Sequence, residues 1–130
     1  MPDKSQTDSQ RDVIAFLSRP ESYGRDVDAV QRIDTHISVV FLAGDRVYKM
    51  KRAVKFEYLD YGTLARRRSF CEAEIETNRR TAPSLYLGVV AVTRAEDGAL
   101  HLNGDGAPVE WLVEMRRFDQ DSLFDRMAES

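Results

Sequence analysis

Apolar and polar residues follow strand-like patterns over several short stretches of the chain. In "HISVVFLAG" both faces are apolar, because Val39 and Phe41 point one way and Val40 and Leu42 point the other. A strand of this kind is covered on both sides of its sheet. The turn at residues 44–45 leads into "RVYKMKR", which predicts an antiparallel hairpin. Further strands are expected over residues 30–34, 85–94, 99–103 and 109–115.

Two segments have the apolar spacing of helices. The first runs from about residue 11 to residue 18 and ends before Pro20, after a polar stretch, residues 1–10, that we expect to be a disordered tail. The second runs from Thr63, which can cap its N-terminus, to Pro83, which stops it. The apolar stripe of this long helix consists of Leu64, Phe70, Cys71 and Ile75.

The order of these elements indicates the fold class. A short helix is followed by strands, one long helix and more strands, which is typical of an α+β domain. We therefore predict an antiparallel sheet of about five strands with one long packed helix and an extra N-terminal helix. A single domain is expected over residues 11–130.

Composition and charge exclude several classes of function. The net charge of −3 provides no basic field for nucleic acid, and the arginines at 66–68 precede acidic residues, which favours a solvated helix face. No apolar run approaches the roughly 20 residues of a membrane span, and the polar N-terminus is not typical of a signal peptide. We therefore expect a cytoplasmic protein with neither a nucleic-acid nor a membrane partner.

Common catalytic and metal-binding motifs are missing from the sequence. It has no GxGxxG, GxxxxGK[ST], GxSxG or HExxH, and its one cysteine, Cys71, lies on an apolar helix stripe and is expected in the core. With two histidines, a metal site would have to rest on carboxylates. What remains is a pair of lysines, Lys49 and Lys51, on one face of a strand.

Four segments carry a resemblance to a known family: "THIS" (35–38), "VFLAGDRVYKMKR" (40–52), "FCEAEIETNRRTAPSLYLGVV" (70–90) and "VEMRRFDQDSLFDRM" (113–127). They resemble the N-terminal part of a bacterial family related to aminoglycoside phosphotransferases, in which a kinase-like domain precedes a P-loop ATP-binding domain. The order of strand lysine, helix carboxylate and late strand also resembles the small lobe of protein kinases. The resemblance implies an ATP-binding small lobe, with ATP as cofactor and Mg²⁺ held mainly by a large lobe.

The resemblance implies which lysine contacts the phosphates. In kinase-like folds the residue two positions before that lysine roofs the adenine, and it should be small or apolar. Lys49 has Val47 at this place, whereas Lys51 would put Lys49 against the ring. We therefore choose Lys49 and expect Lys51 to be a rim or solvent charge. Lys49 as an ordinary solvated lysine, and Lys51 in its role, remain alternatives.

Three glutamates of the long helix are candidates to pair with Lys49. At about 100° per residue, Glu74 lies about 50° from the centre of the apolar stripe, whereas Glu72 and Glu76 lie more than about 100° away. A carboxylate beside the core needs a partner, because an unpaired buried charge is very unfavourable. We choose Glu74. The alternatives are that it reaches water or pairs with an arginine, and that Glu72 takes its place.

Other positions receive roles through the same resemblance. The loop from Asp34 to Ser38 stands where kinases have a glycine-rich loop; it has no glycine, so the hydroxyls of Thr35 and Ser38 would contact the phosphates. His36 in this loop is interpreted as a surface or packing residue. At the back of the adenine pocket the resemblance implies Met115 as gatekeeper, with the hinge hydrogen-bonding groups on the carbonyl of Arg116 and the amide of Phe118.

Kinase chemistry also needs a catalytic aspartate and metal-binding residues. In this fold class a large lobe supplies them, beginning after "SLFDRM", so we assign no catalytic and no metal-binding residue and expect a fragment of a longer protein. Its partners would be nucleotide, the large lobe and a P-loop domain of the same full-length chain. We expect no phosphotransfer and at most weak nucleotide affinity from these residues alone. The alternative is a non-catalytic α+β interaction module in which the lysines and glutamates are surface charges.

Overall fold

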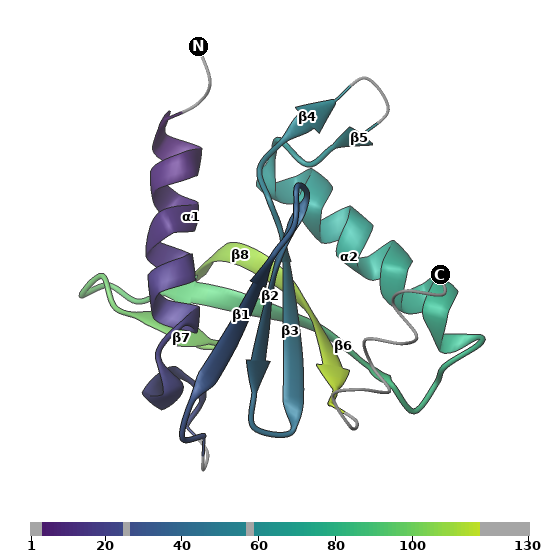
Figure 1. The fold of residues 1–130 in the computed structure, drawn as a ribbon. Coiled ribbons are helices and arrows are strands. Elements are labelled where there is room, and N and C mark those ends of the chain that lie inside the picture. The colour runs from purple at the N-terminus through teal and green to yellow at the C-terminus, as the bar shows by residue number, and fades with distance from the viewer. Residues whose placement is uncertain (1–3, 25–26, 57–58, 118–130) are drawn as a thin grey trace.

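The computed structural model describes residues 4–24, 27–56 and 59–117 and has an α+β fold (Figure 1). Within these residues, no helix is long and apolar enough to cross a membrane. The elements in chain order are α1 (Lys4–Leu17), a 3-10 turn η1 (Pro20–Tyr23), β1 (Val30–Asp34), β2 (Ser38–Ala43), β3 (Arg46–Lys51), β4 (Lys55–Phe56), β5 (Leu59–Asp60), α2 (Leu64–Arg79), β6 (Tyr86–Arg94), β7 (Leu100–Leu102) and β8 (Ala107–Arg116).

Six of the strands form one antiparallel sheet in the order β1-β2-β3-β8-β6-β7. The predicted hairpin at 44–45 is confirmed, since β2 pairs with β3 and Val40 lies opposite Lys49. Strand β8 lies between β3 and β6, so the centre of the sheet joins segments that are distant in sequence. The main sheet has one strand more than the predicted number of about five, and β4 and β5 pair separately as a short two-stranded ribbon before α2.

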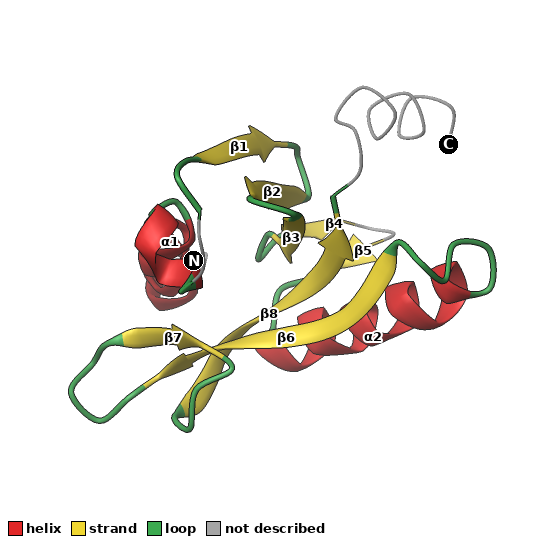
Figure 2. Ribbon diagram, turned by 90° about the horizontal axis from the view of Figure 1, so that it is seen from below, coloured by secondary structure: helices red, strands yellow, loops and turns green. Residues whose placement is uncertain are grey.

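The two helices cover opposite faces of the curled sheet (Figure 2). On the α1 face, buried residues of the helix pack on β2, β3 and β8, and these include Val13, Leu17, Phe41, Met50 and Leu112. On the α2 face, a second cluster contains Val40, Leu42, Val47, Cys71, Ile75, Leu85, Val113 and Met115. All six residues of β2 are buried, as the two-sided apolar pattern predicts.

The helix boundaries differ from the predicted ones. Helix α1 begins at Lys4, so it includes most of the expected disordered tail, and the side chain of Gln10 is buried. Helix α2 ends at Arg79, before the predicted stop at Pro83. Its predicted cap is confirmed, because the Thr63 hydroxyl accepts a hydrogen bond from the backbone amide of Arg66 at 3.2 Å.

The buried face of α2 also differs from the predicted stripe. Cys71 and Ile75 are buried as expected, but Phe70 is 38% exposed and Arg67 is 3% exposed. The interpretation of the whole 66–68 run as a solvated face was therefore wrong at its central residue. The physical reason is a buried carboxylate, Glu110, which lies 2.9 Å from the Arg67 guanidinium.

Candidate functional site

The register of the hairpin places Lys49 and Lys51 on the α2 face of the sheet. Their neighbours along β3, Tyr48 and Met50, pack on the opposite face against the α1 cluster, as the strand alternation predicts. Helix α2 crosses this face with Cys71 and Ile75 buried in the second cluster, which brings Glu74 toward the strand. The two lysines and this glutamate therefore meet between β3 and α2.

Both lysines bind the same carboxylate. The Nζ atom of Lys49 lies 3.2 Å from one oxygen of Glu74, and the Nζ atom of Lys51 lies 2.7 Å from the other. The structure thus brings together the predicted pair of Lys49 and Glu74. Glu72 instead lies 3.5 Å from Arg68 on the exposed side of the helix. We call Lys49, Lys51 and Glu74 the lysine–glutamate cluster.

The expectation that Lys51 is a rim or solvent charge was wrong. Its side chain is 4% exposed, compared with 32% for Lys49 and 14% for Glu74. A buried ammonium is stable here because Glu74 supplies the opposite charge at hydrogen-bonding distance. The more exposed cation of the cluster is therefore Lys49, and Lys51 holds the carboxylate from the buried side.

The charges of the cluster alter its acid–base behaviour. Burial by itself would raise the pKa of Glu74, but the Lys49 and Lys51 charges outweigh it, so the pKa lies below its ordinary value. Burial would likewise lower the pKa of Lys51, yet the Glu74 carboxylate raises it overall. With two ammonium groups and one carboxylate, the cluster carries one surplus positive charge near neutral pH.

Two tyrosines beside the cluster were missed by the sequence reasoning. The ring of Tyr61 lies 5.2 Å from the Lys51 Nζ atom, a cation–π distance. Burial raises the pKa of Tyr86, and the nearby charge of Glu74 raises it further. Tyr61 lies outside every predicted element, and Tyr86 lies in the strand predicted over residues 85–94, where the pattern gave no sign of a neighbouring charge.

The loop before β2 does not present its hydroxyls as expected from the resemblance. The Thr35 hydroxyl accepts hydrogen bonds from the amides of Ile37 and Ser38, at 3.3 and 2.9 Å, and so stabilises the turn. Ser38 is 2% exposed, and among the described residues its Oγ atom has no hydrogen-bond partner. Its Cα pairs with that of Lys51, which places it next to the cluster. His36 is exposed, in agreement with its interpretation as a surface residue.

The residues assigned to the adenine pocket lie close together on neighbouring strands. Val47 and Met115 are paired across β3 and β8, and both are buried in the α2-face cluster, with exposures of 0% and 4%. The backbone amide of Arg116 at the end of β8 donates to the carbonyl of Leu85 at 2.8 Å. Phe118, the predicted hinge amide, lies outside the described residues.

A second buried ion pair lies two turns before Glu74 on α2, and the sequence reasoning missed it. Arg67 donates to Glu110 at 2.9 Å and to the backbone carbonyl of Tyr61 at 2.9 Å. The other oxygen of Glu110 accepts from Gln10 of α1 at 2.9 Å. The sequence could have predicted the burial of Glu110, because side chains two positions apart on a strand point to the same face and Leu112 is an apolar residue of that face, which is buried.

The described residues fit a phosphate better than a metal ion. One surplus ammonium charge beside a largely buried carboxylate suits an anionic group, and lysine is a common phosphate ligand. No three histidine, cysteine, aspartate or glutamate side chains group together within residues 4–24, 27–56 and 59–117 in a way that would hold a metal. These described residues therefore do not fit Mg²⁺.

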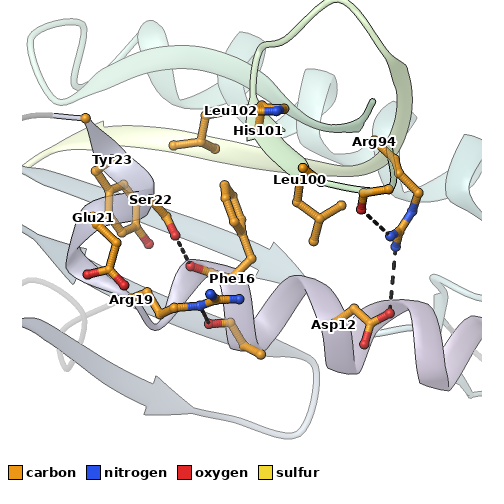
Figure 3. Close-up of a pocket in the computed structure, with 14 residues that line it drawn as sticks. Asp12, Phe16, Arg19, Glu21, Ser22, Tyr23, Arg94, Leu100, His101 and Leu102 are labelled. Atoms are coloured by element: carbon orange, nitrogen blue, oxygen red, sulfur yellow. Dashed lines mark hydrogen bonds and ion pairs between the residues drawn. The ribbon is translucent and has the colours of Figure 1, made fainter. Parts of the chain in front are cut away.

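A groove of about 750 Å³ lies on the other face of the sheet, between α1, η1 and β7 (Figure 3). Phe16, Leu100 and Leu102 are among its apolar lining residues. At its rim Arg94 lies 3.7 Å from Asp12 and donates to the carbonyl of Gly98 at 3.0 Å. These charges satisfy each other, so we place the candidate site at the lysine–glutamate cluster, where two like charges converge on one carboxylate.

Comparison with known proteins gives relatives but no activity. Uncharacterised proteins of Mycobacterium bovis and Mycobacterium tuberculosis are 37% identical to the chain over 86 residues. The matched region is 65% of this chain and 15% of each relative, so the chain spans about 15% of the length of the curated relatives it matches. No family model matches the chain, and no solved structure matches it significantly.

Proposed function

We propose that this chain is the ATP-binding small lobe of a kinase-like phosphotransferase related to aminoglycoside phosphotransferases. In this proposal Lys49 contacts the nucleotide phosphates, while Glu74 and Lys51 fix its position. The proposal assigns no catalytic residue to the chain, because phosphoryl transfer needs a catalytic aspartate and metal ligands in addition to Lys49, Lys51 and Glu74.

The observation that carries the proposal is the lysine–glutamate cluster. Protein kinases use a lysine on the third strand of the small lobe paired with a glutamate on the following helix. Here Lys49 lies on β3, Glu74 lies on α2, and their charged atoms are 3.2 Å apart. The exposure of Lys49, 32%, leaves its ammonium accessible to a ligand while Lys51 remains buried.

Nucleotide titration followed by amide NMR tests the proposal, because chemical shifts detect weak binding. A non-hydrolysable ATP analogue should shift the amides of β3 and of the loop at 35–38. Lys49→Ala should weaken this binding by about 1.5–3 kcal/mol, the range for a lost hydrogen bond to a charged group. Lys55→Ala is the matched control, since it removes an exposed lysine from β4. Equal binding by wild type and Lys49→Ala would instead favour the non-catalytic interaction module.

A further inference from the structure

The buried contacts of Glu110 extend to both faces of the sheet. The pairing of β3 with β8 ends at Met50 opposite Leu112, so Glu110 lies beyond the end of β3. There its carboxylate contacts Gln10 of α1 and Arg67 of α2, although these helices cover opposite faces of the sheet. The two helices are therefore joined through one residue of β8.

The same contacts reach the lysine–glutamate cluster from two directions. The Gln10 amide donates to the backbone carbonyl of Lys51 at 2.9 Å and accepts from the backbone amide of Ala53 at 2.9 Å, which holds the end of β3. Arg67 donates to the backbone carbonyl of Tyr61, whose ring lies over the Lys51 ammonium. Glu110 therefore acts on Lys51 at two places. Through Gln10 it fixes the Lys51 backbone, and through Arg67 and Tyr61 it fixes the surroundings of the Lys51 ammonium.

Arg67 also sets the position of Glu74. The two residues are seven positions apart on α2, which is about two turns, so they project from nearly the same side of the helix, about 10 Å apart along its axis. A helix anchored at Arg67 by a fully buried ion pair has little freedom to roll or slide. Glu74 is then held where the two lysines meet it.

We infer that Glu110 is a positioning residue for the lysine–glutamate cluster: its carboxylate joins α1, β8 and α2 around the end of β3 and fixes where Lys51 and Glu74 meet. Glu110 does not contact the cluster itself, and it acts through Gln10 and Arg67. The expected effect of Glu110 on nucleotide affinity rests on the proposed function, whereas its expected effect on the geometry of the lysine–glutamate cluster is independent of that function.

The test removes the buried pair without leaving an unpaired charge. Replacing a buried ion pair by apolar residues of similar size often preserves stability, so the double variant Arg67→Met with Glu110→Leu should fold. The side-chain ammonium of Lys51 is then observed by ¹⁵N NMR, with Glu74→Gln defining its signal when the carboxylate is lost. We expect the signal in the double variant to move toward that reference, and nucleotide affinity to weaken severalfold.

The matched control is Arg68→Met with Glu72→Leu, which makes the same replacements at the exposed ion pair of the same helix. It should leave the Lys51 signal in place. A folded Arg67→Met, Glu110→Leu variant with a wild-type Lys51 signal would overturn the inference, because the buried pair would then serve stability alone.

A second variant covers the case in which the double variant does not fold. Gln10→Leu removes the neutral contacts of α1 and keeps the ion pair, so it should move the Lys51 signal in the same direction by a smaller amount. An unchanged signal in folded Gln10→Leu would also contradict the inference. If the proposed function is wrong, the wild type will not bind nucleotide. The Lys51 ammonium signals of the variants would still test the positioning role of Glu110, so the two failures can be distinguished.

Discussion

Helix α2 carries two buried ionic clusters that differ in charge balance. Arg67 and Glu110 are 3% and 0% exposed, carry equal and opposite charges, and each makes further hydrogen bonds. The lysine–glutamate cluster has two cations for one carboxylate, and one of its cations, Lys49, is 32% exposed. The first cluster is complete within the protein, whereas the second has a surplus charge that an external anion can neutralise.

The difference indicates how a structural ion pair can be distinguished from a binding site. Burial is similar around Arg67 and Lys51, so burial alone does not separate the two roles. What separates them is whether the charges cancel and whether one charged group reaches solvent. By both criteria the lysine–glutamate cluster is the candidate for ligand binding.

The largest loss of stability is expected when one partner of the Arg67–Glu110 ion pair is removed. Glu110→Ala leaves the Arg67 guanidinium buried without its counter-charge, which should lower the free energy of unfolding by about 3–5 kcal/mol. Urea denaturation measures this change. Glu72→Ala, at the exposed pair with Arg68, should lower it by less than about 1 kcal/mol. Equal stabilities of the two variants would show that the pairs do not differ as described.

A smaller loss is expected at the lysine–glutamate cluster. Glu74→Gln removes the charge that both lysines share, and it should lower the free energy of unfolding by about 1.5–3 kcal/mol, the range for hydrogen bonds to charged groups. The loss should be smaller than for Glu110→Ala, because the glutamine side-chain oxygen can still accept a hydrogen bond from the buried Lys51 and because Lys49 can be hydrated. A larger loss than in Glu110→Ala, measured in the same urea series, would reverse the ranking of the clusters.

The pH dependence of that loss sharpens the comparison. Because the pKa of Glu74 is lowered in the folded protein, its stabilising contribution is fully present above its ordinary value of 4.5 and is lost as the pH falls through the lowered pKa. The stability difference between wild type and Glu74→Gln should therefore be greatest near neutral pH and shrink as the pH falls below 4.5. Urea denaturation at neutral pH and at the lowest pH at which both proteins fold measures it, and an equal difference at the two would exclude an ionised Glu74 as its source.

The smallest effect is expected at Ser38. Its buried hydroxyl has no partner among the described residues, so Ser38→Ala removes an unsatisfied polar group and should leave stability within about 0.5 kcal/mol of wild type or raise it. Thermal and urea denaturation both report this change. A clear loss of stability would mean that the hydroxyl contributes a hydrogen bond near Lys51.

The sequence was most informative where the interactions are local. The alternation in β2 and β3, the turn between them and the Thr63 cap depend on neighbouring residues, and these predictions are confirmed. The angle of Glu74 from the apolar stripe was also sufficient to select it over Glu72 as the partner of Lys49.

The sequence was least informative where a charge is buried by a distant partner. Arg67 and Glu110 are 43 positions apart, and Lys51 and Glu74 are 23 positions apart, so no helix or strand period relates them. Arginine and lysine are usually solvent-exposed, and a pattern-based prediction therefore places them at the surface. Their burial depends on the tertiary fold, which brings a carboxylate to each.

The insertion of β8 between β3 and β6 has a consequence for how the protein is made. Tyr48 and Glu114, which are hydrogen-bonded between β3 and β8, are 66 positions apart, so this pairing closes a long loop and folds slowly. During synthesis β1, β2, β3 and α2 leave the ribosome before β8, the last of the described strands. Until β8 arrives, β3 has an open edge and Arg67 lacks Glu110. The lysine–glutamate cluster is therefore expected to reach its final geometry only when β8 has paired with β3.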